Sequence, residues 1–440
     1  MYKSSLYKKS PIFLQELMIN IKSIIFKLLR ENWLFKERIK ELHNNQYISR
    51  EKLLEQQRSL LKITLDQAKE HVSFYKNVKS SNIDDFPLIG KEDIRIAPCA
   101  FLNDSKKFSY TFKSQTGGTT GKPLNLYSGL SAIIEDHAQS HRQLTWAGYL
   151  PGDKRVWLRA DLIVPLEQNT SPYWRHNRID KMLMMSVYHL SEETVRQYLE
   201  QLHNYKPKII QAYPSAIFLF ANLIESLGLA VNLKIKGIVL SSESCSDNQK
   251  LVIERVFNCK VFSWYGLSER VATAGTCKYG KMHLIEDYGY YEFSDDKLIA
   301  TGFHNSKMPL IRYNTEDIFS GVSSEFNQCE CGLPFLTIKS IQGREGEFLL
   351  STSGRKVLIF NHIPKNVCGL VELQLKQKRI DEIIALVVVD RRYDQQSEKI
   401  LEKNIKTYFG EDMRVLVKKV SSIPRTKNGK FRQAILELEP

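Results

Sequence analysis

The sequence predicts an α/β protein: a large domain with mostly parallel sheets and an N-terminal helical segment, followed by a small α+β C-terminal domain. Three observations predict this class. A chain of 440 residues is long enough for two or three domains. From about residue 105 onward, short β-branched runs alternate with helical runs, which is typical of a parallel sheet covered by helices. The last segment carries a β-α-β pattern of its own. We therefore expect a helical segment over 1–90, the large domain over 91–343 and the small domain over 344–440.

In the helical segment, residues 46–75 have few breakers and apolar residues at i, i+3 and i+4, which predicts a long helix. The stretch Ile12–Leu29 is apolar and basic by turns, and its apolar residues fall on one helix face. Such a face commonly packs on the protein's own core; the alternative is a peripheral contact with a membrane surface. The residues of this face are Leu14, Leu17, Ile21, Ile24, Ile25 and Leu28.

The alternating region predicts strands and helices in turn. Pro151-Gly152 ends its first helix, Ser191 begins the second, and Gly228 stops the third. Strands are expected at 108–112, 155–158, 209–212, 237–240 and 260–264, and helices at 130–150, 191–205, 215–227 and 247–257. In the small domain, strands at 383–389 and 413–420 flank a helix at 396–408.

The composition is that of a folded globular chain, with 42% hydrophobic and 25% charged residues. This excludes disordered, collagen-like and disulfide-scaffold classes. The formal net charge of +14 favours an anionic partner such as a nucleotide, a polyanion or an anionic membrane surface, and it equally fits a basic protein with solvated lysines. Seven cysteines argue against a secreted disulfide framework. With no apolar run long enough to span a membrane and no cleavable leader, we expect a cytoplasmic protein.

The most informative stretch is 114–123, which reads SQTGGTTGKP between two expected strands. Glycines let a loop fold tightly and turn its N–H groups toward an anion, while threonine hydroxyls and a lysine add donors and charge. Taken alone, the loop is either a triphosphate cradle or a Gly/Thr-rich hairpin. It is not a Walker A loop, because the glycine spacing is one residue short and Pro123 follows the lysine. The cradle residues are Thr116, Gly117, Gly118, Thr119, Thr120, Gly121 and Lys122.

The loop resembles the phosphate loop of the adenylate-forming (AMP-binding) enzymes, which include acyl-CoA synthetases, luciferases and peptide-synthetase adenylation domains. Further motifs of that family follow in the family's order over residues 70–440. Within the family, the chain is most similar to the phenylacetate–CoA ligases and the CapK-type capsular-polysaccharide proteins. The motifs are Tyr213-Pro-Ser215, Ser241-Ser-Glu243, Trp264–Glu269, Met308–Asp317, Gly343-Arg344 and Pro424–Lys430.

The resemblance implies ATP-dependent activation of a small carboxylic acid as an acyl-adenylate, followed by transfer to the thiol of coenzyme A. It implies that Thr119, Thr120 and Lys122 hold the β- and γ-phosphates. It further assigns Mg²⁺ to Glu269, a hard-cation ligand, and the two ribose hydroxyls to Asp317. The remaining nucleotide contacts fall on Ser242, Glu243, Tyr265, Gly266, Ser268 and Arg344.

One position departs from the family's motif, and one further position matches it. Glu316 stands where the family's motif has glycine, which puts the backbone next to Asp317 in question. Lys430 matches the C-terminal lysine that would neutralise charge on the α-phosphate during adenylation, since lysine is a mobile point charge. The small domain would then swing to admit the second nucleophile.

Four further residues predict a metal site. Cys277 precedes His283 by six positions, and Cys329 precedes Cys331 by two. Both pairs flank expected strands, and four such ligands suit tetrahedral zinc. The alternative is a set of unrelated cysteines with a separate histidine.

Two other functions remain open. The first is an adenylating enzyme of surface-polysaccharide synthesis that passes the acid to a sugar amine or hydroxyl. The second is a non-catalytic nucleotide-binding protein, which the joint presence of Glu269, Asp317 and Lys430 disfavours. We expect no nucleic-acid partner.

Overall fold

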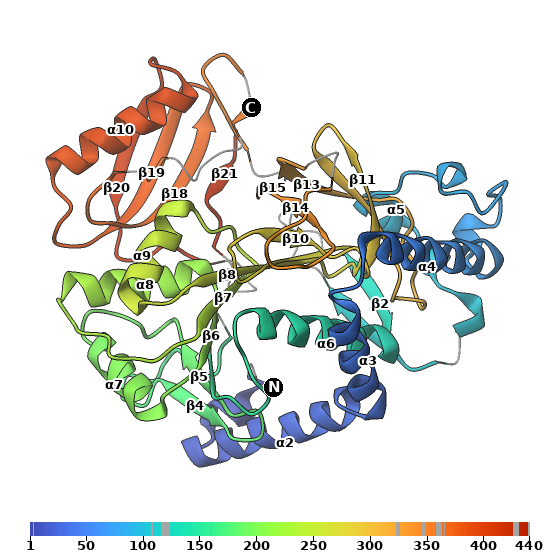
Figure 1. Cartoon of the computed structure of the whole chain (residues 1–440). Helices are drawn as coiled ribbons and strands as arrows, with labels where there is room; N and C mark the ends of the chain where they lie inside the picture. Colours follow the sequence, from blue (N-terminus) through green and yellow to red (C-terminus); the bar gives the residue numbers. More distant parts are fainter. Residues whose placement is uncertain are drawn as a thin grey trace. The chain divides into compact units, whose positions relative to one another are not determined.

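The structure is a computed structural model of the chain, and its fold is α/β as the sequence predicts (Figure 1). The chain divides into two compact units: residues 1–23, 149–261 and 345–440 form the first, and residues 24–148 and 262–344 form the second. The structure describes residues 1–2, 4–106, 109–115, 124–159, 161–322, 326–344, 348–354, 356–357, 363–364, 366–425 and 431–438.

The first unit contains a mostly parallel sheet. Its strands follow the order β7-β6-β3-β5-β4, and only β4, the edge strand, runs antiparallel to its neighbour. Helices α7, α8 and α9 share a core with these strands, in which Ile210, Ile217 and Ile238 are almost fully buried. The elements are β3 (Arg155–Arg159), β4 (Trp174–Asn177), β5 (Met182–Ser186), α7 (Val195–Tyr205), β6 (Ile209–Ala212), α8 (Pro214–Ser226), β7 (Gly237–Ser241) and α9 (Asp247–Phe257).

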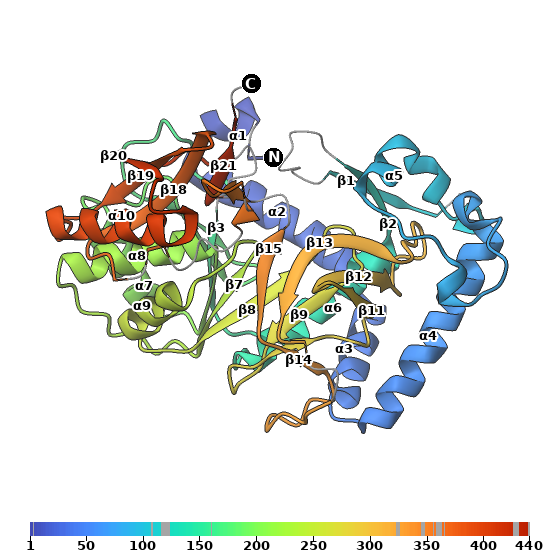
Figure 2. The ribbon, with the colours of Figure 1, turned by 90° about the horizontal axis from the view of Figure 1, so that it is seen from above.

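The C-terminal segment of the same unit has its own sheet, ordered β20-β19-β18-β21, with helix α10 packed against it (Figure 2). Leu375, Leu401 and Phe409 are completely buried in its core. The expected β-α-β pattern is therefore present as β19–α10–β20. The elements are β16 (Leu349–Leu350), β17 (Lys356–Val357), β18 (Leu370–Arg379), β19 (Glu382–Val389), α10 (Gln395–Phe409), β20 (Arg414–Lys419) and β21 (Ala434–Leu436).

The second unit is built on antiparallel strands. One group is ordered β14-β10-β9-β8, a second β11-β12-β13-β15, and β1 and β2 form a hairpin. These elements are β1 (Thr111–Gln115), β2 (Asn125–Gly129), β8 (Val261–Gly266), β9 (Thr273–Thr276), β10 (Met282–Leu284), β11 (Gly289–Ser294), β12 (Lys297–Gly302), β13 (Tyr313–Ser320), β14 (Leu336–Ile338) and β15 (Ser340–Arg344).

The helices of the second unit are α3 (Trp33–Asn45), α4 (Arg50–His71), α5 (Lys91–Ile96) and α6 (Leu130–Trp146). Short 3₁₀ turns lie at Ser73–Tyr75, Ile83–Asp85, Pro98–Phe101 and Asp104–Lys106. Before them come α1 (Ser5–Lys9) and α2 (Ile12–Arg30), so the helical character expected for 1–90 is confirmed. Among the described helices, none combines the length and the apolar content that crossing a bilayer requires.

Several details differ from the sequence prediction. The helix expected at 130–150 ends at Trp146, before Pro151-Gly152, and the helix expected from Ser191 begins at Val195. The strand expected at 108–112 begins at Thr111, because its register is set by pairing with β2, in which Thr111 faces Gly129. Strands β4 and β5 were not predicted. The sequence of β4, Trp-Arg-His-Asn, has no alternation of apolar and polar residues. One of its inward-facing side chains is a charged residue, Arg175, which is completely buried.

Candidate active site

Glu269 follows strand β8 in the second unit and is buried, with 4% of its surface exposed. Its Oε1 accepts a hydrogen bond of 3.1 Å from the hydroxyl of Tyr313 on β13. Its Oε2 is also buried, and none of the residues that the structure describes donates to it. A buried carboxylate oxygen without a donor is costly, and a cation would remove that cost. The residue therefore fits the role of a magnesium ligand.

Asp317 lies on β13 of the same unit and is also 4% exposed. The hydroxyl of Tyr265 donates to its Oδ2 at 2.6 Å, and its own backbone N–H donates to Oγ1 of Thr315 at 3.2 Å. Arg344 on β15 is its direct partner in the strand register, so the backbones of these two predicted nucleotide contacts lie side by side. The ring of Tyr265 meets Phe319 edge-on, with the ring centroids 5.5 Å apart. These contacts hold the carboxylate in one orientation.

Glu316 keeps the backbone conformation that glycine would favour at its position. Its φ is +61°, in the left-handed region. The backbone N–H of Glu316 donates to Oδ1 of Asn314 at 3.0 Å, and its carboxylate pairs with Lys91 on α5. A non-glycine residue in this region costs about 1 kcal/mol, and these two contacts offset that cost. The departure from the family motif therefore leaves the turn before Asp317 in place.

In the first unit, the predicted adenine turn follows β7. Ser242 has a φ of +72°, and its Oγ accepts a 2.9 Å hydrogen bond from Nη2 of Arg159. Glu243 accepts from the backbone N–H of Ser215, at the start of α8, at 3.1 Å. It also accepts from the backbone N–H of Phe431 at 3.0 Å. The turn thus joins the Tyr213-Pro-Ser215 motif to the residue that follows Lys430.

Sequence reasoning missed Arg159. This side chain stands at the carboxyl end of β3, where open α/β sheets commonly bind ligands. Besides Ser242, its Nη2 lies 3.2 Å from the hydroxyl of Tyr213, and its guanidinium covers the Tyr213 ring at 4.5 Å. The sequence offered one signal for this residue, an arginine directly after an expected strand. None of the family motifs matched in this chain includes that position.

Several predicted residues lie outside the described part of the chain. Of the remaining ones, Arg344 is described in its backbone, Gly266 ends β8, and Ser268 lies in the turn between Gly266 and Glu269. The residues outside the description are Thr116, Gly117, Gly118, Thr119, Thr120, Gly121, Lys122 and Lys430. Their roles stay predictions.

The four predicted metal ligands come together in the second unit. Their ligand atoms all lie within 4.8 Å of one another. Sγ of Cys277 is 3.9 Å from Sγ of Cys329, and Sγ of Cys331 is 3.3 Å from Nε2 of His283. Tetrahedral zinc with bonds of about 2.3 Å to sulfur requires spacings of about 3.8 Å. The geometry therefore fits a single tetrahedral ion.

The surroundings of these four residues also suit a metal. His283 is completely buried, and its Nδ1 lies 3.2 Å from the carbonyl oxygen of Phe335. Because a carbonyl only accepts, Nδ1 carries the proton and Nε2 faces the sulfurs. Burial lowers the pKa of His283, which keeps the imidazole neutral, and it raises the pKa of the Cys331 thiol to about 12. A thiolate in this site therefore needs a cation beside it.

Comparisons with known proteins identify chains of similar sequence and fold. Residues 349–437 match the CapK C-terminal domain. Protein CapK of Staphylococcus aureus is 28% identical over 455 residues, which cover 98% of both chains. A crystal structure of 2-hydroxyisobutyryl-CoA ligase in the postadenylation state, bound to R3-HIB-AMP, superposes with a TM-score of 0.64 at 17% identity, covering 86% of this chain and 88% of that one. The same ligase with 2-HIB-AMP and CoA in the thioesterification state gives 0.54 at 16% identity, covering 90% and 91%.

The fold is thus that of the adenylate-forming ligases. Over nearly its whole length, the chain is similar to protein CapK, and the resemblance predicted from its motifs is confirmed.

Proposed function

We propose that the protein uses ATP to activate a small carboxylic acid and then transfers the acyl group to the thiol of coenzyme A. In the first half-reaction, a carboxylate oxygen of the acid attacks the α-phosphorus, the bond to the β-phosphate breaks, and pyrophosphate leaves. In the second, the thiol attacks the acyl carbon, loses its proton and releases AMP. The observation that carries the proposal is the pair of buried carboxylates, Glu269 and Asp317, each held by a tyrosine hydroxyl.

Each residue would contribute by position and charge, because this chemistry depends mainly on electrostatic stabilisation. Asp317 would accept hydrogen bonds from the ribose hydroxyls, while the Tyr265 hydroxyl keeps its carboxylate oriented. Glu269 would hold Mg²⁺, which supplies positive charge beside the departing phosphates. Thr119, Thr120 and Lys122 would contact those phosphates, with Thr116, Gly117, Gly118 and Gly121 shaping the loop. Ser242 and Glu243 would border the adenine.

Lys430 would approach the α-phosphate in the adenylation step. The neighbouring residue supports this assignment, because the backbone N–H of Phe431 is tied to Glu243 at the predicted adenine turn. We propose that the C-terminal domain, residues 344–440, turns after adenylation and withdraws Lys430. We also propose that the protein works in the cytoplasm, where ATP and coenzyme A are available and its cysteines stay reduced.

We propose structural zinc on Cys277, His283, Cys329 and Cys331. Their burial, their mutual spacing and the orientation of His283 support this assignment. The three cysteines share one small core with Leu333 and Phe335. His283 lies on β10, which pairs with β9 and β14. The ion would therefore link β9 and β10 to the turn that carries Cys329 and Cys331.

The test is pyrophosphate release from ATP across a panel of aryl and short aliphatic acids, with and without coenzyme A. We expect acid-dependent release and, with coenzyme A, formation of the acyl thioester. Acid-dependent release without a thioester, but with acylation of an added amino sugar, would instead favour the polysaccharide acceptor. If no acid supports release and calorimetry detects no ATP binding, the protein is not an adenylating enzyme.

A further inference from the structure

Several polar side chains of helix α2 face the protein. Gln15 is 2% exposed, and its Oε1 accepts a 2.7 Å hydrogen bond from Nε of Arg175, which is itself completely buried. The amide nitrogen of Gln15 donates to the carbonyl oxygens of Ser10 at 2.8 Å and Tyr7 at 3.1 Å. These polar contacts attach the first half of the helix together with Ile19, which is 1% exposed and packs in a small core with Ile163 and Val164.

The same polar face covers the edge of the first unit's sheet. Glu16 accepts from the backbone N–H of His176 on β4 at 2.8 Å, and Asn20 donates to the His176 carbonyl at 3.1 Å. Oδ1 of Asn20 also accepts from the backbone N–H of Arg178, which follows β4, at 2.8 Å. An open strand edge is a pairing hazard, and these side chains occupy it. The rotation of α2 about its axis is thereby determined by hydrogen bonds to β4.

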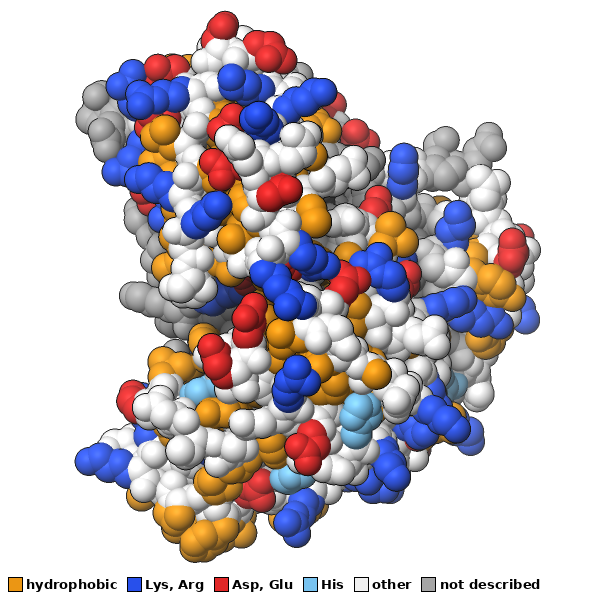
Figure 3. Space-filling view, turned by 90° about the vertical axis from the view of Figure 1, so that its left-hand side faces the viewer, with side chains coloured by type: hydrophobic (Ala, Val, Ile, Leu, Met, Phe, Trp, Pro, Cys, Tyr) orange, Lys and Arg blue, Asp and Glu red, His pale blue; other side chains and the backbone are white. Residues whose placement is uncertain are grey.

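That rotation leaves the apolar stripe of α2 in solvent. Phe13 is 68% exposed, Leu17 52%, Ile21 49%, Ile25 53% and Leu28 74%. These residues recur every three or four positions, so they form one continuous line about 23 Å long. Hydrophobic side chains gather at the bottom of the face drawn in Figure 3, at the height where Figure 1 places α2. A continuous exposed apolar strip marks an interaction surface.

We propose that α2 lies on an anionic membrane surface with this stripe inserted among the acyl chains. Charge complementarity selects that occupant. Residues 1–36 hold seven lysines and arginines against two glutamates. Lys9 and Lys27 are exposed near the two ends of the stripe, and no carboxylate lies within it. An apolar stripe flanked by basic residues is the pattern of helices that lie in the membrane interface.

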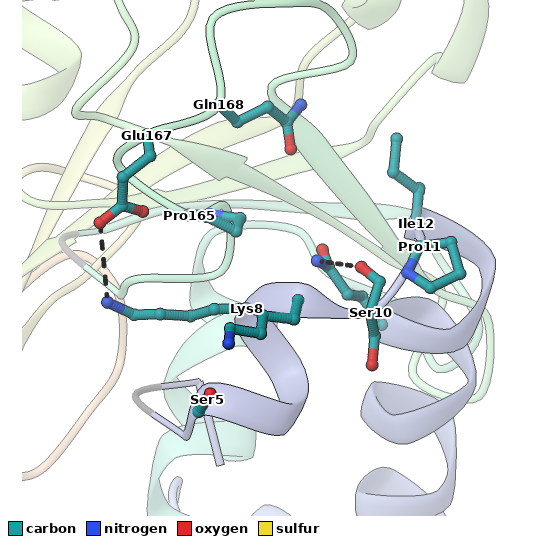
Figure 4. Close-up of a pocket in the computed structure, with 10 residues that line it drawn as sticks. Ser5, Lys8, Ser10, Pro11, Ile12, Pro165, Glu167 and Gln168 are labelled. Atoms are coloured by element: carbon teal, nitrogen blue, oxygen red, sulfur yellow. Dashed lines mark hydrogen bonds and ion pairs between the residues drawn. The ribbon is translucent and has the colours of Figure 1, made fainter.

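A hollow lies at the N-terminal end of α2. It has a volume of about 660 Å³, and Ser5, Lys8, Lys9 and Ser10 are among the residues that border it (Figure 4). Gln15, on the side of α2 that faces the protein, also borders it, so the hollow is separate from the apolar stripe. Glu167 on its wall pairs with Lys8 at 3.9 Å, while Lys9 adds positive charge near the start of α2.

A second copy of the chain fits the surface less well. One convex helix stripe offers little area compared with the roughly 1,200–2,000 Å² of a stable protein interface. A twofold pairing of α2 with itself would also bring basic residues near basic residues, which repel. A bilayer accepts a convex helix without a matching groove and supplies the opposite charge.

The test is co-sedimentation of the full chain with vesicles of phosphatidylcholine alone and of equal parts phosphatidylcholine and phosphatidylglycerol. We expect binding to the mixed vesicles that weakens with salt. The triple variant Leu17→Gln, Ile21→Gln, Ile25→Gln should lose affinity by about tenfold or more, because three inserted side chains are removed. It should keep its thermal midpoint, because all three side chains are exposed.

The matched control is Ile96→Gln, Leu150→Gln, Leu251→Gln, which changes three apolar residues outside α2 that are more exposed than the three in the stripe. This variant should sediment with vesicles like the wild type. Equal binding by the wild type and the α2 variant would overturn the proposal. So would a wild-type dimer in light scattering that the α2 variant converts to monomer, because the stripe would then be covered by a second copy. The assay uses no ATP or acid, so its outcome is independent of the proposed ligase activity.

Discussion

The proposed adenylation chemistry depends strongly on one carboxylate, that of Glu269. Glu269 is buried with only one hydroxyl donor among the described residues, an unfavourable arrangement that a bound cation would relieve. The motif in the sequence predicted its identity as a ligand. Its burial and its contact with Tyr313 could not be predicted, because Tyr313 lies on a strand 44 residues further along the chain.

We predict that Glu269→Gln lowers the adenylation rate by a factor of about 10² or more, because the variant would hold the Mg²⁺ charge less firmly beside the departing phosphates. The thermal midpoint should stay the same or rise, because the amide removes a buried charge. Pyrophosphate release measured against Mg²⁺ concentration should show a higher half-saturation for the variant. Glu55→Gln, on the exposed side of α4, is the control. An unchanged Mg²⁺ dependence would remove the ligand assignment.

Glu135 on α6 gives a stability prediction in the second unit. Burial raises its pKa, but His304 and Arg38 outweigh burial and lower it to about 2. Arg38 donates to both of its oxygens, at 2.6 and 3.0 Å. Because the folded pKa is depressed, the stabilisation is fully present above the ordinary value of 4.5 and is lost as the pH falls toward 2.

We therefore expect Glu135→Gln to lower the free energy of unfolding at pH 7 by about 2–3 kcal/mol, since it breaks a buried pair and leaves Arg38 with only the more exposed Glu41 as a charge partner. Urea unfolding of both proteins should show this difference shrinking between pH 4.5 and pH 2. A difference that stays constant over this range would mean that the Glu135 carboxylate is not the titrating group.

At the scale of elements, helix α2 shows where periodicity misleads. The sequence predicted the helix correctly, and Leu17, Ile21, Ile24, Ile25 and Leu28 do share a face. The commoner interpretation, that this face packs on the core, is wrong for these residues, which are exposed. An apolar stripe normally marks the buried side of a helix. Here the polar side chains of α2 bond to β4, about 160 residues further along the chain. A local sequence pattern cannot predict contacts at that distance.

The Cys/His cluster depends on how several strands bring distant residues together. Convergence of its ligands could be anticipated from their places beside strands, and the structure brings them together, while the presence of zinc stays a prediction. We expect about one zinc per chain by elemental analysis of untagged protein. Cys331→Ser should lose the zinc and lower the thermal midpoint, because the metal joins three segments of the chain.

Cys99→Ser is the control for this experiment, because Cys99 is exposed and outside the cluster. It should retain full zinc content and the wild-type midpoint. Untagged wild-type protein without zinc would show that the four residues are only a buried sulfur–imidazole cluster.

At the scale of the whole molecule, the order of motifs along the chain was enough to predict the fold class, because motifs that follow one another in a family's order indicate that family's architecture. The residues of the phosphate loop and Lys430 were predicted from the same motifs and lie outside the described part of the chain. The domain boundaries and the division of labour between domains also stay predictions. Measuring the rates of the two half-reactions separately can test the proposed roles of the two domains.

Lys430→Ala should lower the adenylation rate by a factor of about 10² or more, as expected when one positive charge is removed from a phosphorus-centred transition state. ATP affinity should change little, because the other predicted nucleotide contacts remain. Transfer from preformed acyl-adenylate to coenzyme A should be far less affected, because Lys430 would by then have turned away. Lys427→Ala, in the same segment, is the matched control and should alter neither step. Equal losses in both half-reactions would argue against the domain movement and for a structural role, whereas an unchanged adenylation rate would exclude Lys430 from catalysis.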